Sequence, residues 1–288
     1  MLSPGARIAV ISPSGISDLA RLERGMDLVR SWGYAPSLLA AASDRHRYLA
    51  GTDAARLSDL QDAFSGRWDA VWMARGGYGL SRLLPLLKVK RLAPIPFFGF
   101  SDGTALLNPL ARKGRPAVHA PVLHALAAHN DEASQTHLRM LLASGGESLF
   151  LGRPLVEGRA EGRLCGGNLC VIAAACGTRH QLDATGAIVL LEDVGEPPYK
   201  LDRLLVQCRD SGVFEGAAGF VLGDFLESQP PPGADWTVAD VVLDVLGPLR
   251  VPILAGMPFG HGRTNLAVPF GGRARISGDR LRVDAVRP

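Results

Sequence analysis

The sequence has few of the residues that dominate disulfide-stabilised or zinc-binding proteins. Its 288 residues include only four cysteines, and no two of them form a C-x-x-C pair. Three of the four lie in an apolar, alanine-rich stretch, where free cysteine behaves as a small hydrophobic residue. His119, His124 and His129 recur every five residues, but five helical steps turn by roughly 140°, so successive rings would point apart. We therefore expect buried thiols and no metal site.

The net charge is small, and long apolar runs are absent. The net charge is +3, and the arginines are scattered, with no basic run dense enough to follow a phosphate backbone. No segment supplies the roughly 18 uninterrupted apolar residues of a membrane-spanning helix. Pro4 and Gly5 stand where a signal peptide would need a charged start and an apolar core. These absences argue against nucleic acid and membrane partners, and they lead us to expect a cytoplasmic protein.

What the first half does have is a regular alternation of short apolar runs with longer amphipathic ones. This is the pattern of a parallel sheet covered by helices, so we predict a doubly wound α/β fold. Thr52 and Asp53 are both suitable N-caps for the second helix. The predicted strands are at 8–11, 36–40, 69–74 and 95–99, and the predicted helices are at 18–32, from 52 onward, and from 101 toward 114.

A change in composition marks a boundary between two domains. The stretch 142–148 loses its periodicity and is rich in small residues. We therefore expect an N-terminal α/β domain at 1–150, a linker at 151–162 and a C-terminal domain at 163–288. In the second domain we expect short strands at 187–192, 219–222, 252–255 and 274–283, and helices near 168–176 and 199–211.

Gly99-Phe100-Ser101-Asp102-Gly103 matches the G-x-S-x-G motif, and it lies between a predicted strand and a predicted helix. Small residues beside the serine permit a turn sharp enough to expose its Oγ. The N–H of the next residue, at the helix start, would point toward a developing oxyanion. The alternative is a serine that only caps a helix after a strand, which is common in α/β folds. The pentapeptide alone does not choose between these interpretations.

A second glycine-rich segment, Arg75-Gly76-Gly77-Tyr78-Gly79, directly follows the third predicted strand. Parallel sheets bind ligands at this carboxyl edge, and glycine lets the backbone approach a ligand closely. The segment lacks the G-x-G-x-x-G spacing and the P-loop lysine, so it fits an oxyanion contributor or substrate platform better than a phosphate cradle. An ordinary glycine turn remains the alternative. Ser12-Pro13-Ser14-Gly15 follows the first strand at the same edge.

The C-terminal half supplies acids and a histidine after predicted strands. Glu192, Asp193 and Glu196 follow an apolar run, although acids at a strand end are often only solvated. A period of two places Glu192 on one face of its strand and Asp193 on the other, and leaves the direction of Glu196 open. His261 lies between glycines in a loop after a later strand, from which an imidazole could reach across to a nucleophile.

Together, these segments resemble the LD-carboxypeptidase family of serine peptidases over nearly the whole chain. The matching segments are, in order, Ser12-Pro13-Ser14-Gly15, Tyr48-Leu49-Ala50-Gly51-Thr52-Asp53, Arg75-Gly76-Gly77-Tyr78-Gly79, Gly99-Phe100-Ser101-Asp102, Gly166-Gly167-Asn168-Leu169, Leu191-Glu192-Asp193, Tyr199-Lys200-Leu201-Asp202-Arg203, Gly223-Asp224-Phe225 and Gly260-His261. Any one of these matches is weak, but so many in the same order are specific.

The resemblance implies a Ser–Glu–His triad carried by Ser101, Glu192 and His261. It further implies that the backbone amides of Gly77 and Asp102 form the oxyanion hole, and that no metal or cofactor is needed. The expected architecture is a flavodoxin-like N-terminal domain and a smaller, β-rich C-terminal domain, with the site in the cleft and the chain forming a homodimer.

The resemblance also implies a substrate class. The family's usual substrate is the murein tetrapeptide, cut before its terminal D-alanine during cell-wall recycling, and a related group cleaves the amide of peptide-nucleotide antibiotics. A cation would be needed to hold the terminal carboxylate, and Arg75 and Arg263 are candidates because each adjoins a loop of the expected cleft.

Two interpretations from other classes stay open at this point. An esterase of the α/β-hydrolase type shares the elbow and the order Ser, acid, His, but only four strands precede Ser101 and no H-G-G-G motif is present. A non-catalytic ligand-binding protein of two lobes would also place glycine loops at a cleft, and its function would not depend on Ser101.

Overall fold

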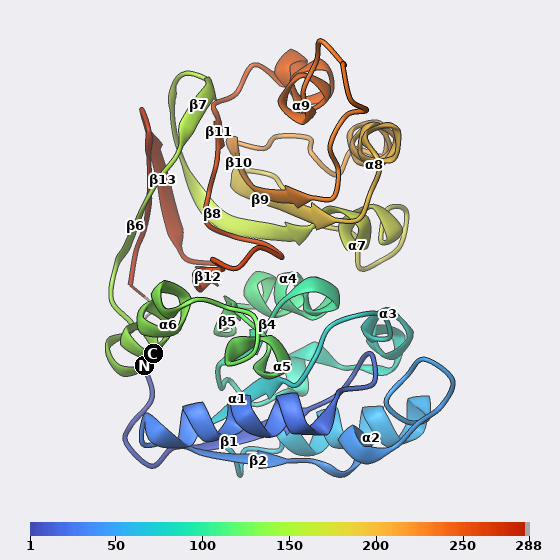
Figure 1. Cartoon of the computed structure of the whole chain (residues 1–288), viewed down its shortest axis with the longest axis vertical. Coiled ribbons are helices and arrows are strands. Elements are labelled where there is room, and N and C mark those ends of the chain that lie inside the picture. Colours follow the sequence, from blue (N-terminus) through green and yellow to red (C-terminus); the bar gives the residue numbers. More distant parts are fainter. Residues whose placement is uncertain (286–288) are drawn as a thin grey trace. The chain divides into compact units, whose positions relative to one another are not determined.

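The chain builds two separate sheets in the computed structural model, which describes residues 1–285 (Figure 1). The first unit comprises residues 1–146 and 266–271, and the second comprises 147–265 and 272–285. Residues 266–271, expected in the C-terminal domain, thus belong to the first unit. The segment 151–162, expected as a linker, instead forms strand β7 (Arg153–Val156) and the start of β8 (Arg159–Asn168).

The first unit contains a six-stranded sheet in which five neighbouring strands are parallel. The predicted α/β fold is therefore confirmed, and all four strands predicted in the first half are present. The sixth strand runs antiparallel and pairs Val268 with His119. In sheet order the strands are β12 (Val268–Phe270), β5 (Ala117–His119), β4 (Phe97–Gly99), β3 (Ala70–Met73), β1 (Arg7–Ile11) and β2 (Ala35–Leu38).

Helices cover both faces of this sheet because its strands alternate apolar side chains to either side. Phe98 points to the face that packs α1, α5 and α6, whereas its neighbour Phe97 contacts Phe64, at the end of α2. Thr52 accepts the Ala55 N–H at the start of α2, which confirms it as a cap, and Asp18 accepts the Arg21 N–H at the start of α1. The helices are α1 (Leu19–Ser31), α2 (Asp53–Ala63), α3 (Leu80–Leu83), α4 (Thr104–Arg112), α5 (Leu123–Leu126) and α6 (Glu132–Ser144).

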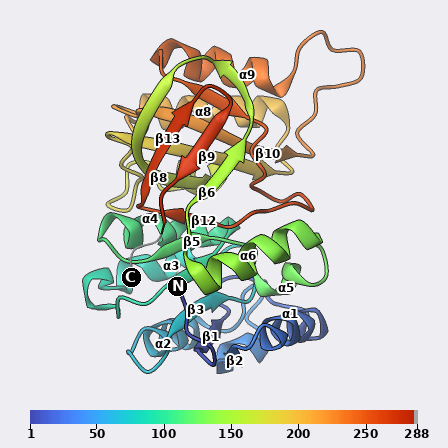
Figure 2. The same ribbon diagram turned by 90° about the vertical axis from the view of Figure 1, so that its left-hand side faces the viewer.

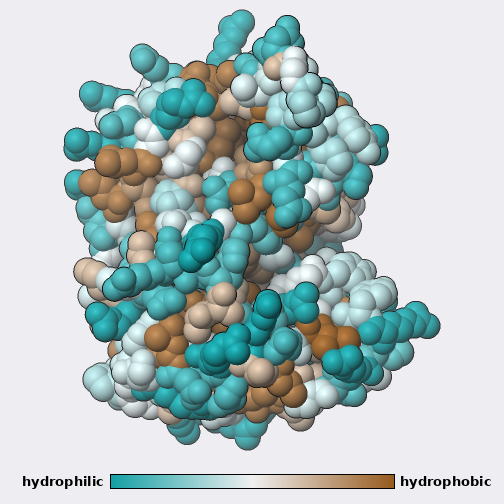
Figure 3. Space-filling model, viewed as in Figure 1, coloured by the Kyte–Doolittle hydropathy of each residue, from teal (hydrophilic) through white to brown (hydrophobic). Residues whose placement is uncertain are grey.

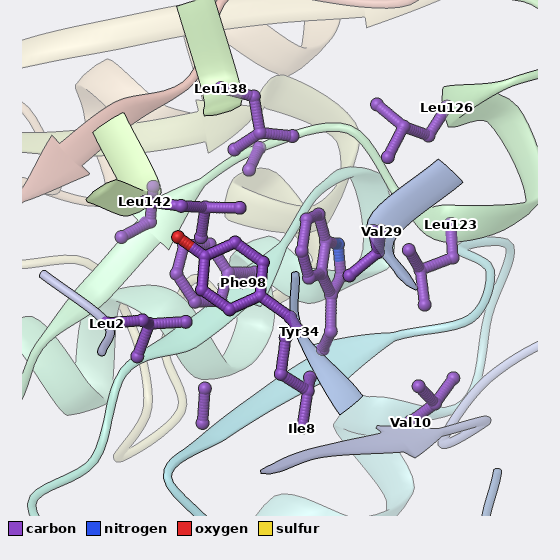
Figure 4. Packing of buried hydrophobic residues seen from close by; sticks show 14 of the residues in the cluster. Leu2, Ile8, Val10, Val29, Tyr34, Phe98, Leu123, Leu126, Leu138 and Leu142 are labelled. Carbon is purple, nitrogen blue, oxygen red and sulfur yellow. The ribbon is translucent and has the colours of Figure 1, made fainter. Parts of the chain in front are cut away.

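The core of this face is shown in Figure 4. Phe98 and Ile8 of the sheet pack against Val29 of α1, Leu123 of α5 and Leu138 of α6, and all five side chains are fully buried. Truncating a fully buried aromatic such as Phe98 to alanine costs about 3 to 5 kcal/mol. This packing fixes the strands whose carboxyl ends carry the candidate site.

The second unit contains an eight-stranded mixed sheet, part of which faces the viewer in Figure 2. Strands β8, β9, β10 and β11 are parallel, and the outer strands are antiparallel. The strands expected at 187–192 and 219–222 are longer than predicted, and the expected strand at 274–283 is a hairpin of two. In sheet order the strands are β6 (Ser148–Leu151), β14 (Arg280–Val283), β13 (Arg273–Ser277), β8, β9 (Ala187–Val194), β10 (Gly219–Leu226), β11 (Ile253–Ala255) and β7.

Three helices pack on this second sheet: α7 (Leu169–Ala174), α8 (Pro198–Asp210) and α9 (Val238–Leu246). Their buried side chains form a separate core with β9 and β10, in which Leu205 of α8 and Val245 of α9 pack with Phe220. Each of the two sheets therefore has its own core.

The exposed surface mixes polar and apolar residues. On the face drawn in Figure 3, hydrophilic side chains are spread over both units with hydrophobic ones between them. Among the helices of residues 1–285, none combines the length and the hydropathy that a bilayer crossing demands.

Candidate functional site

Ser101 lies on a sharp turn between β4 and α4. A short 3₁₀ helix (Ser101–Gly103) begins directly after the strand, and Ser101 itself has a φ of +57°, in the left-handed region that non-glycine residues rarely occupy. Such a conformation costs about 1 to 3 kcal/mol, so the surrounding structure must hold it in place. The strand–turn–helix context that the G-x-S-x-G motif requires is therefore present.

The carboxylate of the next residue, Asp102, anchors this turn from inside the protein. It is buried and accepts hydrogen bonds from Ser14 Oγ at 2.5 Å and from the Leu80 N–H at 2.8 Å. Burial raises the pKa of Asp102, while the two hydrogen bonds and the nearby Arg56 guanidinium lower it. The carboxylate thus joins the turns after β1 and β3 to the elbow. The sequence indicated a role for the backbone amide of Asp102 but gave no sign of this role of its side chain.

The glycine-rich loop after β3 presses directly on Ser101. A Cβ atom built on Gly76 would lie 2.8 Å from Ser101 Cβ and 2.9 Å from its Oγ, which leaves room only for glycine. The Gly15 N–H donates to Gly76 O at 3.0 Å, and Gly77 adopts a φ of +104°. The three segments expected at the carboxyl edge of the first sheet do lie together there.

Arg75 is exposed, and its guanidinium donates a hydrogen bond to the carbonyl of Ile16. This bond ties the loop after β3 to the turn after β1. It gives Arg75 a structural role in addition to the carboxylate-binding role for which the sequence made it a candidate.

In the second unit, His261 and Glu192 form a hydrogen-bonded pair. Glu192, near the end of β9, is fully buried, and its Oε2 lies 2.8 Å from Nδ1 of His261, in the turn after β11. A carboxylate beside Nδ1 favours the tautomer that carries its proton there, which leaves Nε2 as the nitrogen able to accept a proton. The other Glu192 oxygen, Oε1, is buried without a hydrogen-bond partner in residues 1–285. The contact with the His261 ring is therefore the main interaction that offsets the cost of burying the Glu192 charge.

The two neighbouring acids lie elsewhere. Asp193 points to the opposite face of β9, where it accepts bonds from Asn168 Nδ2 at 3.0 Å and the Cys170 N–H at 2.8 Å. Burial raises the pKa of Asp193 to about 6. Glu196 pairs instead with Lys200 at 3.3 Å. The contacts agree with the predicted alternation along β9, which places Glu192 and Asp193 on opposite faces. Of the three acids Glu192, Asp193 and Glu196, it is Glu192 that contacts His261.

The side chains favoured by metals are dispersed. Throughout the described range 1–285, no three His, Cys, Asp or Glu side chains gather in a way that would hold an ion. Cys165, Cys170, Cys176 and Cys208 are free thiols, and burial raises the pKa of the Cys165 thiol to about 12.

The structure thus combines a serine on a strained elbow in the first unit with a hydrogen-bonded Glu–His pair in the second. The family model for the LD-carboxypeptidase N-terminal domain matches residues 8–120, and the model for the LD-carboxypeptidase C-terminal domain matches residues 161–276. The chain belongs to the LD-carboxypeptidase family. This membership sets aside the α/β-hydrolase esterase.

Among its relatives is the murein tetrapeptide carboxypeptidase of Pseudomonas aeruginosa, which is 37% identical, with 96% of this chain and 94% of the relative covered. The crystal structure of muramoyltetrapeptide carboxypeptidase from Oxalobacter formigenes is similar, with a TM-score of 0.88 and 27% identity, over 98% of this chain and 99% of that one. The microcin C7 self-immunity protein MccF shares the fold at a TM-score of 0.87 and 21% identity, over 99% of this chain and 97% of that one.

Proposed function

We propose that this chain is a serine carboxypeptidase that cleaves an L,D-peptide bond and releases the terminal D-alanine of a murein tetrapeptide. The observation that carries the proposal is the His261–Glu192 pair, because a buried carboxylate that fixes an imidazole through Nδ1 is what a serine nucleophile requires of its base. Ser101, on its strained elbow, is the proposed nucleophile.

The proposed reaction follows from these roles. His261 Nε2 removes the Ser101 proton, and the alkoxide attacks the carbonyl of the diamino acid residue. The backbone amides of Gly77 and Asp102 stabilise the oxyanion of the tetrahedral intermediate. Glu192 stabilises the imidazolium, which then protonates the leaving amine of D-alanine. Water, deprotonated by His261 in turn, hydrolyses the acyl-enzyme and regenerates the Ser101 hydroxyl.

The substrate assignment is supported by the 37% identity to a protein named murein tetrapeptide carboxypeptidase. The similarity to MccF, at 21% identity, concerns the fold, and it keeps hydrolysis of a peptide-nucleotide amide as the alternative activity. The terminal carboxylate would be held by a cation, with Arg75 and Arg263 as candidates. We further infer that the enzyme is a cytoplasmic homodimer that acts in cell-wall recycling.

The decisive experiment offers matched tetrapeptides ending in D-alanine or L-alanine, the D-alanine peptide with an amidated C-terminus, and an aminoacyl sulfamoyl adenosine. Products are identified by mass spectrometry, with Ser101→Ala as the control. We expect release of D-alanine alone, and suppression by amidation because the carboxylate charge is lost. Equal cleavage of the L-terminated peptide would refute the substrate assignment. Cleavage of only the nucleotide analogue would favour the alternative activity, and turnover by Ser101→Ala would refute the nucleophile.

A further inference from the structure

The turn that carries His261 is held by an acid to which no role in the reaction has been given. Asp224, in β10, is half-buried, and its Oδ2 accepts a hydrogen bond from the Gly262 N–H at 3.2 Å. The backbone N–H of Asp224 donates to Phe259 O at 2.8 Å. One residue of β10 therefore fixes the chain on both sides of His261.

Asp224 reaches this position because β10 contains a bulge. Leu222 pairs with Leu191 and Phe225 pairs with Asp193, so two residues of β10, Gly223 and Asp224, stand opposite the single residue Glu192. Bulges of this kind redirect a side chain, and they are frequent beside active sites. The bulge lies directly opposite the acid that binds His261.

The two glycines that flank His261 fit closely around the same aspartate. A Cβ atom on Gly260, which has a φ of +132°, would lie 3.0 Å from Asp224 Cβ and 3.4 Å from Glu192 Oε2. A Cβ atom on Gly262 would lie 2.4 Å from Asp224 Oδ2. The turn at 260–262 therefore packs closely against both Asp224 and Glu192, and a side chain at either glycine would clash.

The charged groups that act on Asp224 are Glu192 of β9 and His261 of the turn itself. Burial raises the pKa of Asp224 and the Gly262 N–H lowers it, while the charge of Glu192 raises it and that of His261 lowers it. The bond from Gly262 places the Asp224 carboxylate beside the residue that follows His261.

We propose that Asp224 is a positioning residue of the site: its carboxylate fixes the Gly260–Gly262 turn, and hence the direction of the His261 ring, and it supplies a second negative charge that stabilises the imidazolium. This inference rests on the proposed function in so far as His261 is the base. It predicts that the hydrogen bond and the charge make separable contributions.

Two substitutions separate these contributions. In Asp224→Asn the side-chain oxygen still accepts from Gly262, but the charge is lost. We expect KM to stay within about twofold and the acid limb of the kcat/KM profile to move down by about 0.5 to 1 pH unit, because the protonated ring is less stabilised. In Asp224→Ala the bond is lost as well, and kcat should fall by about 10²-fold, the effect of displacing a reacting group by about 1 Å.

Asp244→Asn is the matched control, because Asp244 is an exposed acid of the second unit on α9, and its replacement should change none of these quantities. The titration of the His261 ring, followed by NMR, supplies a measurement that needs no turnover. Its midpoint should move to lower pH in Asp224→Asn and not in Asp244→Asn.

The outcomes are distinguishable. An unchanged His261 titration and an unchanged pH profile in Asp224→Asn would overturn the inference, even if Asp224→Ala fails to fold. So would wild-type kcat in a folded Asp224→Ala. A shifted titration in a protein that cleaves none of the tetrapeptides would support the positioning role and refute the proposed function.

Discussion

Replacing Gly76 by alanine tests the elbow at its tightest contact. Gly76 does not adopt a positive φ, so alanine is compatible with its backbone, but the added methyl group would lie 2.8 Å from Ser101 Cβ. Carbon atoms pack at about 3.5 Å or more, so the loop and the serine must separate by roughly 0.7 Å. Since displacing a reacting group by about 1 Å costs on the order of 10²-fold in rate, we expect kcat to fall by about that factor, or about 2.7 kcal/mol.

The same substitution should leave the protein folded. Overpacking costs about 1 to 3 kcal/mol, and the reduced backbone freedom of the unfolded chain returns about 0.4 to 1 kcal/mol. The assay is D-alanine release at several peptide concentrations, together with the thermal unfolding transition. Gly247→Ala is the matched control, since a Cβ atom there meets nothing within 4 Å and its φ is −55°. A Gly76→Ala protein with wild-type kcat would refute the argument that this loop fixes Ser101.

Four further results are expected. Ser101→Ala and Ser101→Gly should both lose activity by several orders of magnitude, and the glycine variant should be the more stable by about 1 kcal/mol in denaturant unfolding because it relieves the positive φ. Glu192→Gln should cripple turnover with little change in KM, whereas Glu196→Gln, which removes only the ion pair with Lys200, should not. Activity should fall on acidification because a protonated imidazole cannot act as a base, and a flat profile to about pH 5 would exclude a histidine base. Because burial raises the pKa of Asp193 to about 6, its contribution to stability should fall by up to about 3 kcal/mol as the pH rises from about 4 to 6, and this slope should be absent from unfolding curves of Asp193→Asn.

The first-half fold was predictable because its signals are local. A parallel strand buried on both faces reads as an apolar run, and a helix cap such as Thr52 acts within one turn of the chain. The elbow was predictable for the same reason, since a motif of five residues carries both the serine and the turn.

The strands that were missed have weak local signals. Strand β12 contains Pro269 and is only three residues long, which argues against a strand unless it lies at a sheet edge, as it does here. Strand β7 also contains a proline, and none of its residues is fully buried. Their pairing partners lie far away in the sequence, so no local pattern indicates them.

The candidate site also combines features that local sequence patterns predict with features that depend on distant contacts. Alternation along β9 correctly separated Glu192 from Asp193, because the period of a strand is set locally. The roles of the Asp102 carboxylate and of Asp224 depend on contacts with Ser14, Leu80 and Gly262, which are distant in the chain. A bulge such as the one at Asp224 leaves no periodic signal in the sequence.

The pairing of β12 with β5 has a consequence for synthesis. Residues 1–146 emerge from the ribosome before residues 268–270, which pair with the edge of their sheet at β5. Until residues 268–270 have been made, the strand at that edge exposes unpaired N–H and C=O groups, which are sites for association with other nascent chains. Residues 1–146 cannot complete the six-stranded sheet by themselves, and a fragment that ends at residue 146 should aggregate more readily than the full chain.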